Sequence, residues 1–593
     1  MTIRTLSDLF EVAARHDKPD CLLHKRDGDY RPIATRELVD QVRRLAKALE
    51  RAGVRSGDRV AQMAENGPHW PLIDFAALAL GAAHVPIYPT LLPEGAAYIA
   101  NDSGSRILFV QGAERLAGLL SVKGRMPTVE KIVVIDGPAS DPGVVTLEDF
   151  VASGEGVTEE EFSAWLRRAT PETLATLIYT SGTTGDPKGV MLTHGNITTN
   201  VLAASKALDI QPSWTALSFL PLAHSFERTV AYIYFYLGVS IAYAESVQTV
   251  AQNMQEARPH VFVSVPRVYE KVMARVYENA SAAGGLKAAI FRWAVKVGRE
   301  HVADRLAERP PSLRLKIADK LVFSKIRERL GGRFEMAASG GAPLGRDVAE
   351  FFWGAGVRIF EGYGLTETSP VLTVNRPRAA KLGTVGQAIE GIELRIAEDG
   401  EVLAQGPNIM KGYFGKPEAT AEVIDAEGWF HTGDIGQLDD EGFLTITDRK
   451  KELIVNAYGK NIAPAPIENA LKASRWISQA VVIGDRRQYL AALIVPDFEA
   501  LGPWATAQGL SGAPEQLIGE PAVREMFAAE IGHVNKELAR YEQIRAWSLL
   551  PAEFTLEGGE LTPTLKVKRR VIGQKYGEVI GRLYAEIDAK AKD

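Results

Sequence analysis

A short stretch rich in glycine and hydroxyl side chains has the composition of a phosphate-binding loop. The stretch YTSGTTGDPKGV, at 179–190, ends the apolar run LATLIYT and precedes a helix predicted to begin near Asn196. Its glycines leave backbone N–H groups accessible, its small hydroxyl residues add side-chain donors, and Lys188 adds a positive charge. It is not a Walker A loop, because Pro187 stands five residues after Gly182 and no Gly-Lys-Ser/Thr sequence follows. The candidate phosphate-binding residues are Thr180, Ser181, Gly182, Thr183, Thr184, Gly185 and Lys188. Taken alone, such a loop is more often an ordinary turn.

The composition excludes several classes of protein. The chain has 593 residues, which is enough for several domains or for one large domain with a smaller partner. Hydrophobic residues make up 46% and charged residues 24%, as in ordinary folded proteins, so neither disorder nor a fibrous repeat dominates. The 68 Lys and Arg residues stand against 74 Asp and Glu residues, for a formal net charge of −6. We therefore expect no nucleic-acid partner bound through bulk positive charge.

Cysteine content and the N-terminal sequence indicate a cytoplasmic protein. Cys21 is the single cysteine, which excludes an intramolecular disulfide, a cysteine-based zinc site and an iron–sulfur cluster. The first twenty residues have the pattern of an amphipathic helix and no secretory apolar core. The longest uncharged run, Thr229 to Ala244, is shorter than the roughly 18 to 20 residues that cross a bilayer, so we interpret it as a buried helix. We expect any membrane contact to be peripheral, at the inner face of the membrane.

Helical and strand-like segments alternate along most of the chain. The first of them are helical at 35–52 and 70–80 and strand-like at 59–63 and 84–87. This alternation predicts an α/β fold, a large N-terminal domain of parallel-rich sheets flanked by helices. From about Gly383, short strands separated by Gly, Asp and Asn turns predict an added small β unit. Beyond Thr447, a further mixture of strands and helices predicts a smaller α+β domain.

Six further motifs follow the loop along the chain. They are LPLAHSFER (220–228), SGGAPL (339–344), EGYGLTET (361–368), WFHTGDIG (429–436), DRKKELIV (448–455) and LTPTLKVKR (561–569). Together with YTSGTTGDPKG, they resemble the signature motifs of the adenylate-forming superfamily, which includes acyl-CoA synthetases, firefly luciferase and nonribosomal peptide adenylation domains. LPLAHSFER, EGYGLTETSP and LTPTLKVKR are most similar to the long-chain fatty acyl-CoA synthetases. An accidental match to all seven motifs is negligible.

The resemblance implies a ligase that works in two steps. A fatty acid carboxylate attacks the α-phosphate of ATP to give acyl-AMP and pyrophosphate, and the thiol of coenzyme A then displaces AMP. Both steps bring negatively charged groups together, so catalysis should depend on charge neutralisation and positioning. The alternatives are a fatty acyl-AMP ligase that loads a carrier protein and a non-catalytic acyl-nucleotide binder. The presence of Lys566, Glu367 and Asp434 argues against the second alternative.

The same resemblance assigns the nucleotide contacts. Tyr363 is expected to stack on adenine, Thr366 to touch phosphate, and Glu367 to help hold Mg²⁺, for which a carboxylate is a suitable ligand. Asp434 is expected to accept the ribose hydroxyls, with Arg449 as its basic partner. The residues expected to form the wall of the adenine pocket are Gly340, Gly341 and Ala342, where missing side chains permit close approach of the ring.

Two further residues are assigned to the reacting groups. In the family, the segment that contains His224 borders the acyl tunnel, so we assign His224 to substrate positioning or gating. A histidine that is simply hydrogen-bonded at a helix start is the structural alternative. Lys566 matches the lysine that reaches the carboxylate and the α-phosphate during adenylation, and a flexible ammonium suits a bridge between two anions. The alternative is a basic surface patch shared with Lys568.

The domain boundary is expected at the hinge motif. Residues 1–450 would form the N-terminal adenylation domain with the ATP and acyl sites, and residues 451–593 a mobile C-terminal domain that carries the catalytic lysine. Lys451 matches the hinge position and is counted with the coenzyme A contacts. Tyr458 stands where much of the superfamily has the glycine that lets the pantetheine arm pass, and Gly459 follows it. The groove for coenzyme A is therefore expected to involve Gly459 as well as Tyr458.

The expected partners are small molecules, namely the fatty acid, ATP and coenzyme A, and the protein is expected to be a monomer or a homodimer. One stretch points to a further contact. Asp304 to Arg333 carries nine basic residues against four acidic ones, with apolar residues between them. Such a stretch either rests on an anionic membrane or forms ordinary solvated helix faces.

Overall fold

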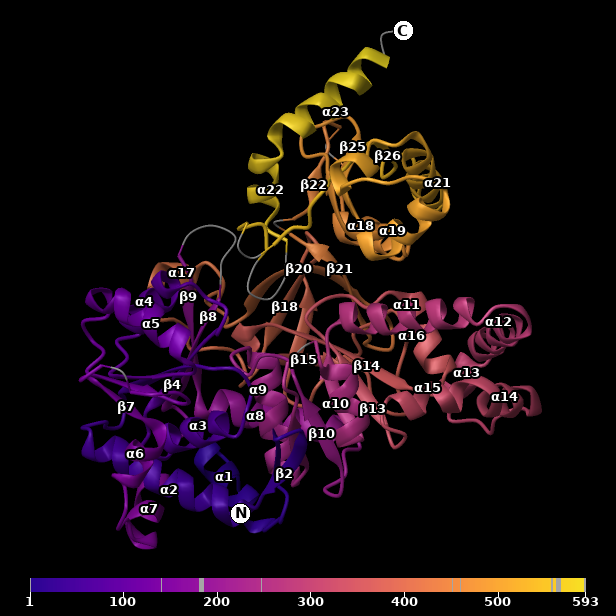
Figure 1. The fold of residues 1–593 in the computed structure, drawn as a ribbon. Coiled ribbons are helices and arrows are strands. Elements are labelled where there is room, and N and C mark those ends of the chain that lie inside the picture. Colours follow the sequence, from indigo (N-terminus) through magenta and orange to yellow (C-terminus); the bar gives the residue numbers. More distant parts are fainter. Residues whose placement is uncertain are drawn as a thin grey trace. The chain divides into compact units, whose positions relative to one another are not determined.

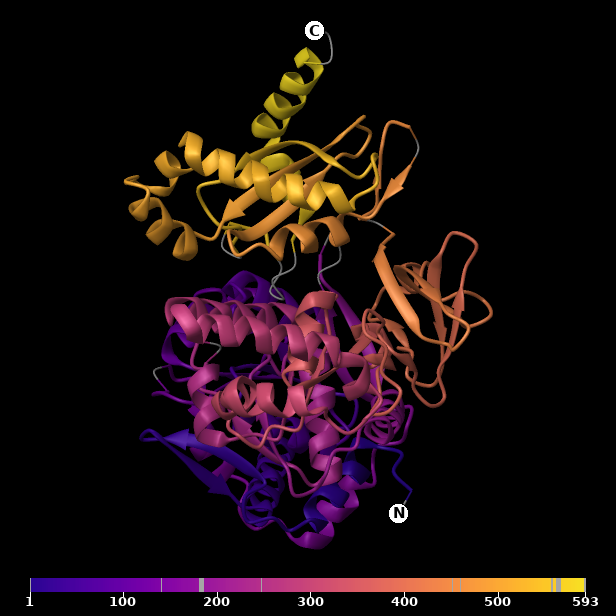
Figure 2. The same cartoon turned by 90° about the vertical axis from the view of Figure 1, so that its right-hand side faces the viewer.

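The computed structural model describes residues 2–139, 141–180, 186–246, 248–450, 452–458, 460–555, 558–561 and 567–590 (Figures 1 and 2). Contacts along the chain divide it into two compact units. The first comprises Met1–Arg395, Leu403–Thr432 and Leu438–Leu444, and the second comprises Ile396–Val402, Gly433–Gln437 and Thr445–Asp593.

The first unit contains an eight-stranded sheet that leads into the phosphate-loop motif. Its strands are β3 (Arg59–Met63), β4 (Ala83–Ile87), β5 (Ile107–Val110), β6 (Lys131–Val134), β7 (Val144–Thr146), β8 (Leu174–Thr180), β9 (Lys188–Thr193) and β19 (Gly412–Tyr413). Their order is β19-β9-β8-β4-β3-β5-β6-β7. The strands from β8 to β7 run parallel, whereas β9 is antiparallel to β8 and β19 is antiparallel to β9.

The second sheet of this unit has nine strands. They are β1 (Leu22–Arg26), β2 (Asp29–Ile33), β10 (Thr215–Ser218), β11 (Ser240–Tyr243), β12 (Val261–Ser264), β13 (Met336–Ser339), β14 (Arg358–Gly364), β15 (Val371–Val374) and β16 (Gln387–Ala388). Their order is β16-β15-β14-β13-β12-β10-β11-β1-β2. The inner strands from β14 to β1 are parallel, and β1 pairs with β11 although more than 200 residues separate them. Antiparallel strands close both edges.

Helices lie between the two sheets and on their outer faces. The inner ones are α1 (Leu6–Arg15), α2 (Thr35–Arg51), α3 (His69–Ala79), α8 (His194–Ala207) and α9 (Ser225–Leu237), which share one buried cluster with both sheets. The outer face of the eight-stranded sheet packs on α4 (Pro93–Asp102) and α5 (Ala113–Ser121). The outer face of the nine-stranded sheet packs on α10 (Val250–Ala257), α11 (Pro266–Ala282), α12 (Gly285–Glu300), α14 (Leu313–Ala318), α15 (Ser324–Arg329) and α16 (Arg346–Gly354). Two short helices, α6 (Leu147–Ala152) and α7 (Glu159–Leu166), complete the N-terminal part.

Helices cover both faces of the sheets because the strands have apolar side chains on both faces. Ile107 and Phe109 of β5 belong to the cluster between the sheets, whereas Leu108 and Val110 belong to the outer cluster. Side chains alternate between the two faces of a strand, so a continuous apolar run is buried on both sides. The expected α/β fold with parallel-rich sheets is confirmed.

One of the predicted helices is not found as predicted. The uncharged run Thr229 to Ala244 is not a single buried helix, because α9 ends at Leu237 and β11 begins at Ser240. Gly238 separates them with a left-handed backbone, φ 75°, and a Cβ at this position would lie 2.8 Å from the ring of His16. The run is buried because it forms a helix followed by a strand of the same core. No helix among the described residues combines the length and apolar character required to cross a membrane.

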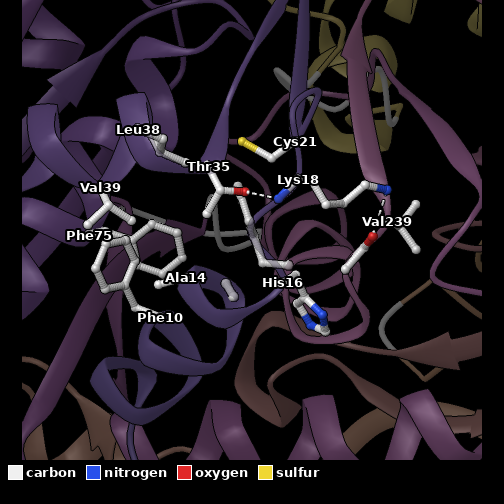
Figure 3. Close-up of a pocket in the computed structure, with 13 residues that line it drawn as sticks. Phe10, Ala14, His16, Lys18, Cys21, Thr35, Leu38, Val39, Phe75 and Val239 are labelled. Atoms are coloured by element: carbon white, nitrogen blue, oxygen red, sulfur yellow. Dashed lines mark hydrogen bonds between the residues drawn. The ribbon is translucent and has the colours of Figure 1, made fainter.

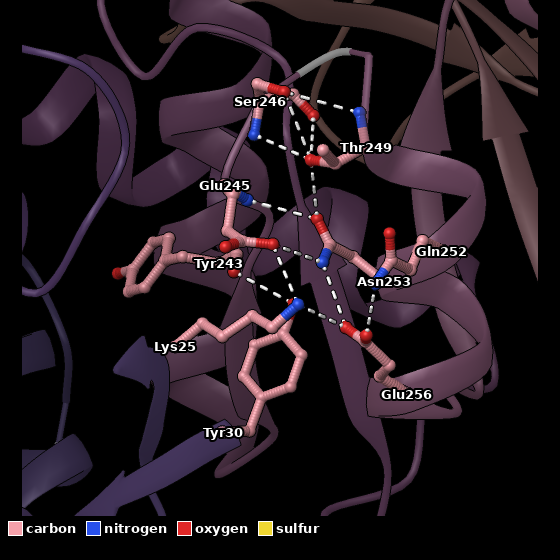
Figure 4. A network of polar contacts seen from close by, with 9 residues as sticks. All are labelled: Lys25, Tyr30, Tyr243, Glu245, Ser246, Thr249, Gln252, Asn253 and Glu256. Carbon is pink, nitrogen blue, oxygen red and sulfur yellow. Dashed lines mark hydrogen bonds and ion pairs between the residues drawn. The ribbon is translucent and has the colours of Figure 1, made fainter. Parts of the chain in front are cut away.

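A cluster of charged and polar side chains fastens the β1–β2 hairpin to β11 and α10 (Figure 4). The Nζ atom of Lys25 lies 2.8 Å from carboxylate oxygens of both Glu245 and Glu256. Asn253, which is fully buried, donates to both carboxylates at 3.0 and 3.1 Å. Lys25 lowers the pKa of both glutamates through these hydrogen bonds. The lysine therefore holds together two carboxylates that would otherwise repel each other.

We expect Lys25→Met to lower the melting temperature by a few degrees at neutral pH. Both glutamates have folded-state pKa values below the unfolded value of about 4.3, so the stabilisation from the lysine is complete above that pH and is lost as the pH falls through the folded values. The difference between variant and wild type should therefore shrink in acid. Melting curves from pH 3 to 7 measure it, with Arg26→Met on the same strand as the control. A difference that stays constant down to pH 3 would contradict this interpretation.

The small β-rich segment near 393–449 contributes strands to both units. Its strands are β17 (Glu393–Ile396), β18 (Glu401–Gln405), β20 (Phe430–Leu438) and β21 (Leu444–Arg449), and a short helix, α17 (Pro417–Ala421), lies between β19 and β20 in the sequence. This segment is the small β unit that the turn-rich sequence predicts.

The second unit continues with α18 (Pro464–Lys472), β24 (Ile477–Ile483), β25 (Leu490–Pro496), α19 (Phe498–Ala507), α20 (Pro514–Leu517), α21 (Pro521–Glu537), β26 (Ile544–Leu549), α22 (Arg569–Lys575) and α23 (Gly577–Lys590). Before them, β22 (Ile454–Val455) and β23 (Asn461–Ile462) form a small hairpin. The three strands β24, β25 and β26 form one sheet. Its faces are both buried: Val482 and Ile494 pack in one cluster, and Val481 and Leu493 pack in the other. This is the predicted smaller α+β domain.

Candidate active site

Three of the motifs lie at the carboxyl ends of neighbouring parallel strands in the first unit. LPLAHSFER follows β10, SGGAPL begins at the last residue of β13, and EGYGLTET covers the end of β14. The strands β10, β12, β13 and β14 are consecutive parallel neighbours, so the three motifs leave the sheet at one edge. Ligands of parallel α/β sheets bind at this edge.

Direct contact joins two of these motifs. The Oγ atom of Ser225, at the first turn of α9, lies 3.2 Å from Oγ1 of Thr366, and both residues are buried. Thr366 begins a short 3₁₀ turn, η3 (Thr366–Thr368), directly after β14 and Leu365. The structure therefore brings the candidate phosphate contact, Thr366, to the start of the helix that His224 precedes.

Glu367 lies in the same turn and is held by β19 and by Met410, which precedes that strand. Its backbone carbonyl accepts a hydrogen bond from the N–H of Met410 at 2.8 Å, and its Oε1 accepts one from the Tyr413 hydroxyl at 2.9 Å. Burial, and then the charge of Glu367, raise the pKa of Tyr413, so this hydroxyl stays protonated and remains a donor. The Nζ atom of Lys188 lies 4.9 Å from the centre of the Tyr413 ring. Tyr413 thus connects the phosphate-loop lysine to the candidate metal ligand.

The surroundings of Glu367 fit Mg²⁺ bound together with a nucleotide. Among the described residues, no group of three or more His, Cys, Asp or Glu side chains could hold a metal ion. Magnesium in nucleotide enzymes usually needs only one or two carboxylates and completes its ligands with phosphates and water. Glu367 is partly exposed, and within the described part of the chain its hydrogen bonding uses Oε1. Its second oxygen is therefore available as a metal ligand.

The glycines of SGGAPL allow two elements to meet. Gly340 is buried, and a Cβ there would lie 3.1 Å from the ring of Phe226 on α9 and 3.6 Å from the carbonyl oxygen of Gly362 on β14. Gly341 has a left-handed backbone, φ 80°, and with Ala342 it is exposed at the end of β13. A small residue at 340 is therefore required by packing, whereas 341 and 342 form an accessible surface next to the end of β14, where Tyr363 lies.

His224 caps the N-terminus of α9. Its Nδ1 accepts a hydrogen bond from the backbone N–H of Phe226 at 3.1 Å, which places the ring proton of the neutral form on Nε2. This is the structural role considered as the alternative for this residue. It also fixes the direction of the ring at the start of the helix, so the assignment to substrate positioning stays a prediction.

The candidate ribose-binding pair lies together in the second unit. Asp434 of β20 is 4% exposed, and its Oδ1 lies 3.1 Å from Nε of Arg449 at the end of β21. The backbone of the next residue, Lys450, donates to the carbonyl of Gly433 at 2.8 Å and holds the two strands in this register. The two residues that the resemblance pairs are therefore paired in the structure.

Several predicted site residues lie outside the described residues. They are Ser181, Gly182, Thr183, Thr184 and Gly185 of the loop, Lys451 and Gly459 of the hinge segment, and Lys566. Thr180 is the last residue of β8, and Lys188 the first of β9, so the strands that flank the loop are defined. Tyr458 is 68% exposed, in a turn where Asn456 accepts from the backbone N–H groups of Tyr458 and Lys460 at 3.0 and 2.9 Å.

The structure contains a buried ionic network between α3, α9 and β8 that the sequence does not predict. Arg228 of α9 forms an ion pair with Asp74 of α3, 2.5 Å between Nη2 and Oδ1, and donates to Oγ1 of Thr176 at 2.7 Å. The Tyr232 hydroxyl donates to Asp74 at 2.6 Å. All four residues are at most 2% exposed. Because Thr176 lies on β8, which leads into the phosphate loop, the network ties the loop strand to the helix that carries His224 and Ser225. The only signal in the sequence was a charged pair, Glu227 and Arg228, beside an apolar run.

Glu227 is buried without a compensating charge. It is 1% exposed, its Oε2 has no hydrogen-bond partner among the described residues, and burial raises its pKa to about 8 against the effect of a hydrogen bond with Ser218. The carboxyl is therefore neutral in the folded protein at physiological pH and ionised in the unfolded chain, whose pKa is about 4.3.

We expect Glu227→Gln to stabilise the protein at pH 8 relative to the wild type. Between pH 4.3 and 8 the folded state keeps a proton that the unfolded state has lost, so the wild-type glutamate costs up to about 1.4 kcal/mol for each pH unit in that interval. Melting temperatures from pH 5 to 8 should show the variant gaining on the wild type as the pH rises. The exposed Glu148→Gln serves as control and should run parallel to the wild type. Parallel curves for Glu227→Gln would show that its pKa is not raised.

A cavity of about 20 Å³ lies apart from the motifs (Figure 3). It is lined by apolar side chains of α1, α2, α3 and the end of α9, among them Phe10, Phe75 and Phe235, with Lys18 and His16 at its side. This volume leaves room for about one water molecule, so the cavity holds no nucleotide or acyl chain. It contains none of the motif residues, and we interpret it as an imperfection of packing around α1.

Comparison with known proteins decides the family. A family model described as AMP-binding enzyme matches residues 9–414, and one described as AMP-binding enzyme C-terminal domain matches residues 451–588. The chain belongs to the AMP-binding enzyme family. This membership confirms the adenylate-forming superfamily that the seven motifs indicate, and with it a fold that binds ATP or AMP.

Relatives of this AMP-binding enzyme cover nearly all of its length. It is 38% identical over 580 residues to "Long-chain-fatty-acid--CoA ligase FadD15" of Mycobacterium bovis, which covers 96% of this chain and 95% of the relative. It is 32% identical to "Long-chain-fatty-acid--CoA ligase ACSBG1" of Bos taurus, over 99% of this chain and 86% of the relative.

A solved structure confirms the fold. The A domain of carboxylic acid reductase from Segniliparus rugosus, in complex with AMP and a co-purified carboxylic acid, aligns with 98% of this chain and 94% of its own at a TM-score of 0.78 and 22% identity. At this identity the likeness shows the fold alone.

Proposed function

We propose that the protein activates long-chain fatty acids to acyl-CoA at the expense of ATP. The observation that carries the proposal is the convergence of separate motifs at one edge of the nine-stranded sheet, where Ser225 meets Thr366, and where Tyr413 connects Glu367 to Lys188. The relatives named as long-chain fatty acid ligases support the substrate class.

In the first step a carboxylate oxygen of the fatty acid forms a bond to the α-phosphorus of ATP, and the bond to the bridging oxygen of pyrophosphate breaks. Lys188, Thr366 and the N–H groups of the loop would hold the phosphates, and Lys566 would neutralise the approaching carboxylate. Bound through Glu367, Mg²⁺ would supply positive charge to the phosphates. Asp434 and Arg449 would orient the ribose.

In the second step the thiol of coenzyme A releases its proton to solvent, its sulfur bonds to the acyl carbonyl carbon, and the carbon–oxygen bond to AMP breaks, so that AMP leaves with both electrons of that bond. Rotation of the 451–593 domain about Lys451 would exchange the adenylation geometry for the geometry of this step. Tyr458, on its exposed turn, would then contact the pantetheine arm.

The two half-reactions provide the test. With palmitate, ATP and Mg²⁺ but no coenzyme A, the protein should release pyrophosphate and retain acyl-AMP, and later addition of coenzyme A should release AMP and the thioester. A panel of acids from acetate to stearate, scored for AMP and acyl-CoA, should favour long chains. Formation of ADP and phosphate would overturn the mechanism. Acyl-AMP that coenzyme A cannot discharge would instead indicate a ligase that loads a carrier protein, and the absence of any turnover would indicate a binder.

A further inference from the structure

A row of exposed apolar side chains runs along one helical segment at the edge of the first unit. The segment consists of α14, the π turn η2 (Asp319–Phe323) and α15. Leu313 is 74% exposed, and Ile317 and Leu321 are each 44% exposed. Figure 1 shows α14 at the outer edge of the helices that cover the nine-stranded sheet and α15 closer to β13, and Figure 2, which views the molecule from that side, shows this helical layer in front.

A π turn, which contains the third member of this row, lies between α14 and α15. An α-helix has 3.6 residues per turn, so each step of four residues overshoots a full turn, and a row with that spacing winds around the helix. In η2 the N–H of Ser324 donates to the carbonyl of Asp319, five residues earlier, which makes a wider turn. Four residues of such a turn come closer to one full turn than four residues of an α-helix do, which brings Leu321 towards the side of the segment that carries Ile317. Leu315, Ala318 and Phe323 are buried beneath the same segment, so its other face already supplies the core.

Positive charge borders the row. Residues 309–329 contain seven basic residues and two acidic ones, in a chain whose net charge is −6. Lys316 and Lys320, each one position before an apolar residue of the row, are exposed and have no ion-pair partner within the described part of the chain. Of the two acidic residues, Asp319 is neutralised by Arg327 at 2.7 Å. The segment thus presents uncompensated positive charge next to exposed apolar side chains.

We propose that this face docks the protein on an anionic lipid bilayer. The face is called the α14–α15 stripe and consists of Leu313, Ile317 and Leu321 with Lys316 and Lys320. Three apolar side chains on a convex helix offer too little surface for a stable protein complex, which buries about 800 Å² on each partner. They suit a bilayer surface, where the apolar side chains enter the acyl boundary and the lysine stems extend to the anionic headgroups. Under the proposed function, docking would bring the enzyme to the membrane that dissolves its substrate.

Sedimentation with vesicles tests the docking independently of catalysis. The full chain is mixed with vesicles of phosphatidylcholine alone or with 30% phosphatidylglycerol, and the bound fraction is measured at low and at high salt. We expect binding to the anionic vesicles that weakens as salt rises. Leu313→Gln/Ile317→Gln/Leu321→Gln should reduce the partition coefficient by about tenfold or more, and Lys316→Glu/Lys320→Glu by about tenfold. All five positions are exposed, and unchanged melting temperatures show that the variants fold.

Leu92→Gln/Arg125→Glu is the matched control, because Leu92 is 72% exposed, Arg125 is exposed, and they lie directly before α4 and shortly after α5, the helices that pack on the eight-stranded sheet. The control should bind vesicles like the wild type. The proposal would be overturned if the triple glutamine variant of residues 313, 317 and 321 bound vesicles as well as the wild type. It would also be overturned if the control lost as much binding as that variant. A third outcome would overturn it as well: the wild type self-associates without binding vesicles, and the triple glutamine variant no longer self-associates. The α14–α15 stripe would then join two protein chains. Failure of the ligase assay with vesicle binding intact would concern the proposed function alone.

Discussion

Replacing Lys566 with alanine should slow acyl-AMP formation by about 100-fold or more and leave the second half-reaction largely intact. The lysine is proposed to neutralise the carboxylate and the α-phosphate only in the adenylation geometry, and loss of such an electrostatic group costs a factor of this size. Pyrophosphate release from ATP and palmitate measures the first step. Thioester formation from supplied acyl-AMP measures the second.

The control for this prediction is Lys568→Ala. Lys568 belongs to the same basic run, its side chain has no ion pair among the described residues, and its backbone N–H donates to the carbonyl of Glu560 at 2.7 Å, a bond that alanine keeps. It should therefore retain adenylation. Equal loss of both half-reactions in Lys566→Ala would show that Lys566 is structural, and equal loss in both variants would assign the effect to the basic patch as a whole.

Glu367→Gln should reduce adenylation by about 100- to 1,000-fold and raise the Mg²⁺ concentration required for half-maximal rate. Glutamine keeps the size of the side chain and can still accept from Tyr413, but it removes the charge that binds the metal ion. Titration of pyrophosphate release with Mg²⁺ measures both effects.

Tyr413→Phe distinguishes the contribution that the charge of Glu367 makes to the rate from the contribution that its position makes. The variant removes the hydroxyl that holds Oε1 at 2.9 Å but leaves the ring beneath Lys188. We expect a smaller loss of rate than in Glu367→Gln, with little change in Mg²⁺ requirement. If Glu367→Gln kept the wild-type dependence on Mg²⁺, Glu367 would not be a ligand.

Most of the strands could be predicted from the sequence because the apolar pattern that indicates a strand lies within the strand itself. The strand-like run at 59–63 is β3, and the helical runs at 35–52 and 70–80 match α2 and α3 within one residue at each end. The strand β3 and the helix α3 are buried on all sides, whereas α2 buries one face through Leu38, Val42, Leu45 and Leu49, so each apolar pattern follows the period of its own backbone. The run from 229 to 244 does not form the single helix that its uncharged composition predicts, because a buried helix and a buried strand share that composition. Gly238 ends α9 with a left-handed backbone, which favours glycine, and the nearby ring of His16 leaves no room for a Cβ.

The site was predictable where the residues lie within motifs and unpredictable where distant residues meet. Thr366 and Glu367 belong to one motif, whereas Tyr413 follows Glu367 by 46 positions and carries no motif of its own. Arg228 and Asp74 are 154 positions apart. Their pairing depends on how α3 and α9 pack between the sheets, and no local pattern contains that information.

The parallel pairing of β1 with β11 has a consequence during synthesis on the ribosome. Leu22 aligns with Ile241, so the first hairpin of the chain must wait for a strand that is translated more than 200 residues later. At 5 to 20 residues per second, the wait lasts about 10 to 45 seconds. Throughout that interval the parallel edge of β1 has no neighbour, and an unpaired strand edge is where chains aggregate. We therefore expect a fusion partner that shields residues 22–33 during synthesis to raise the soluble yield more than the same partner at the other terminus.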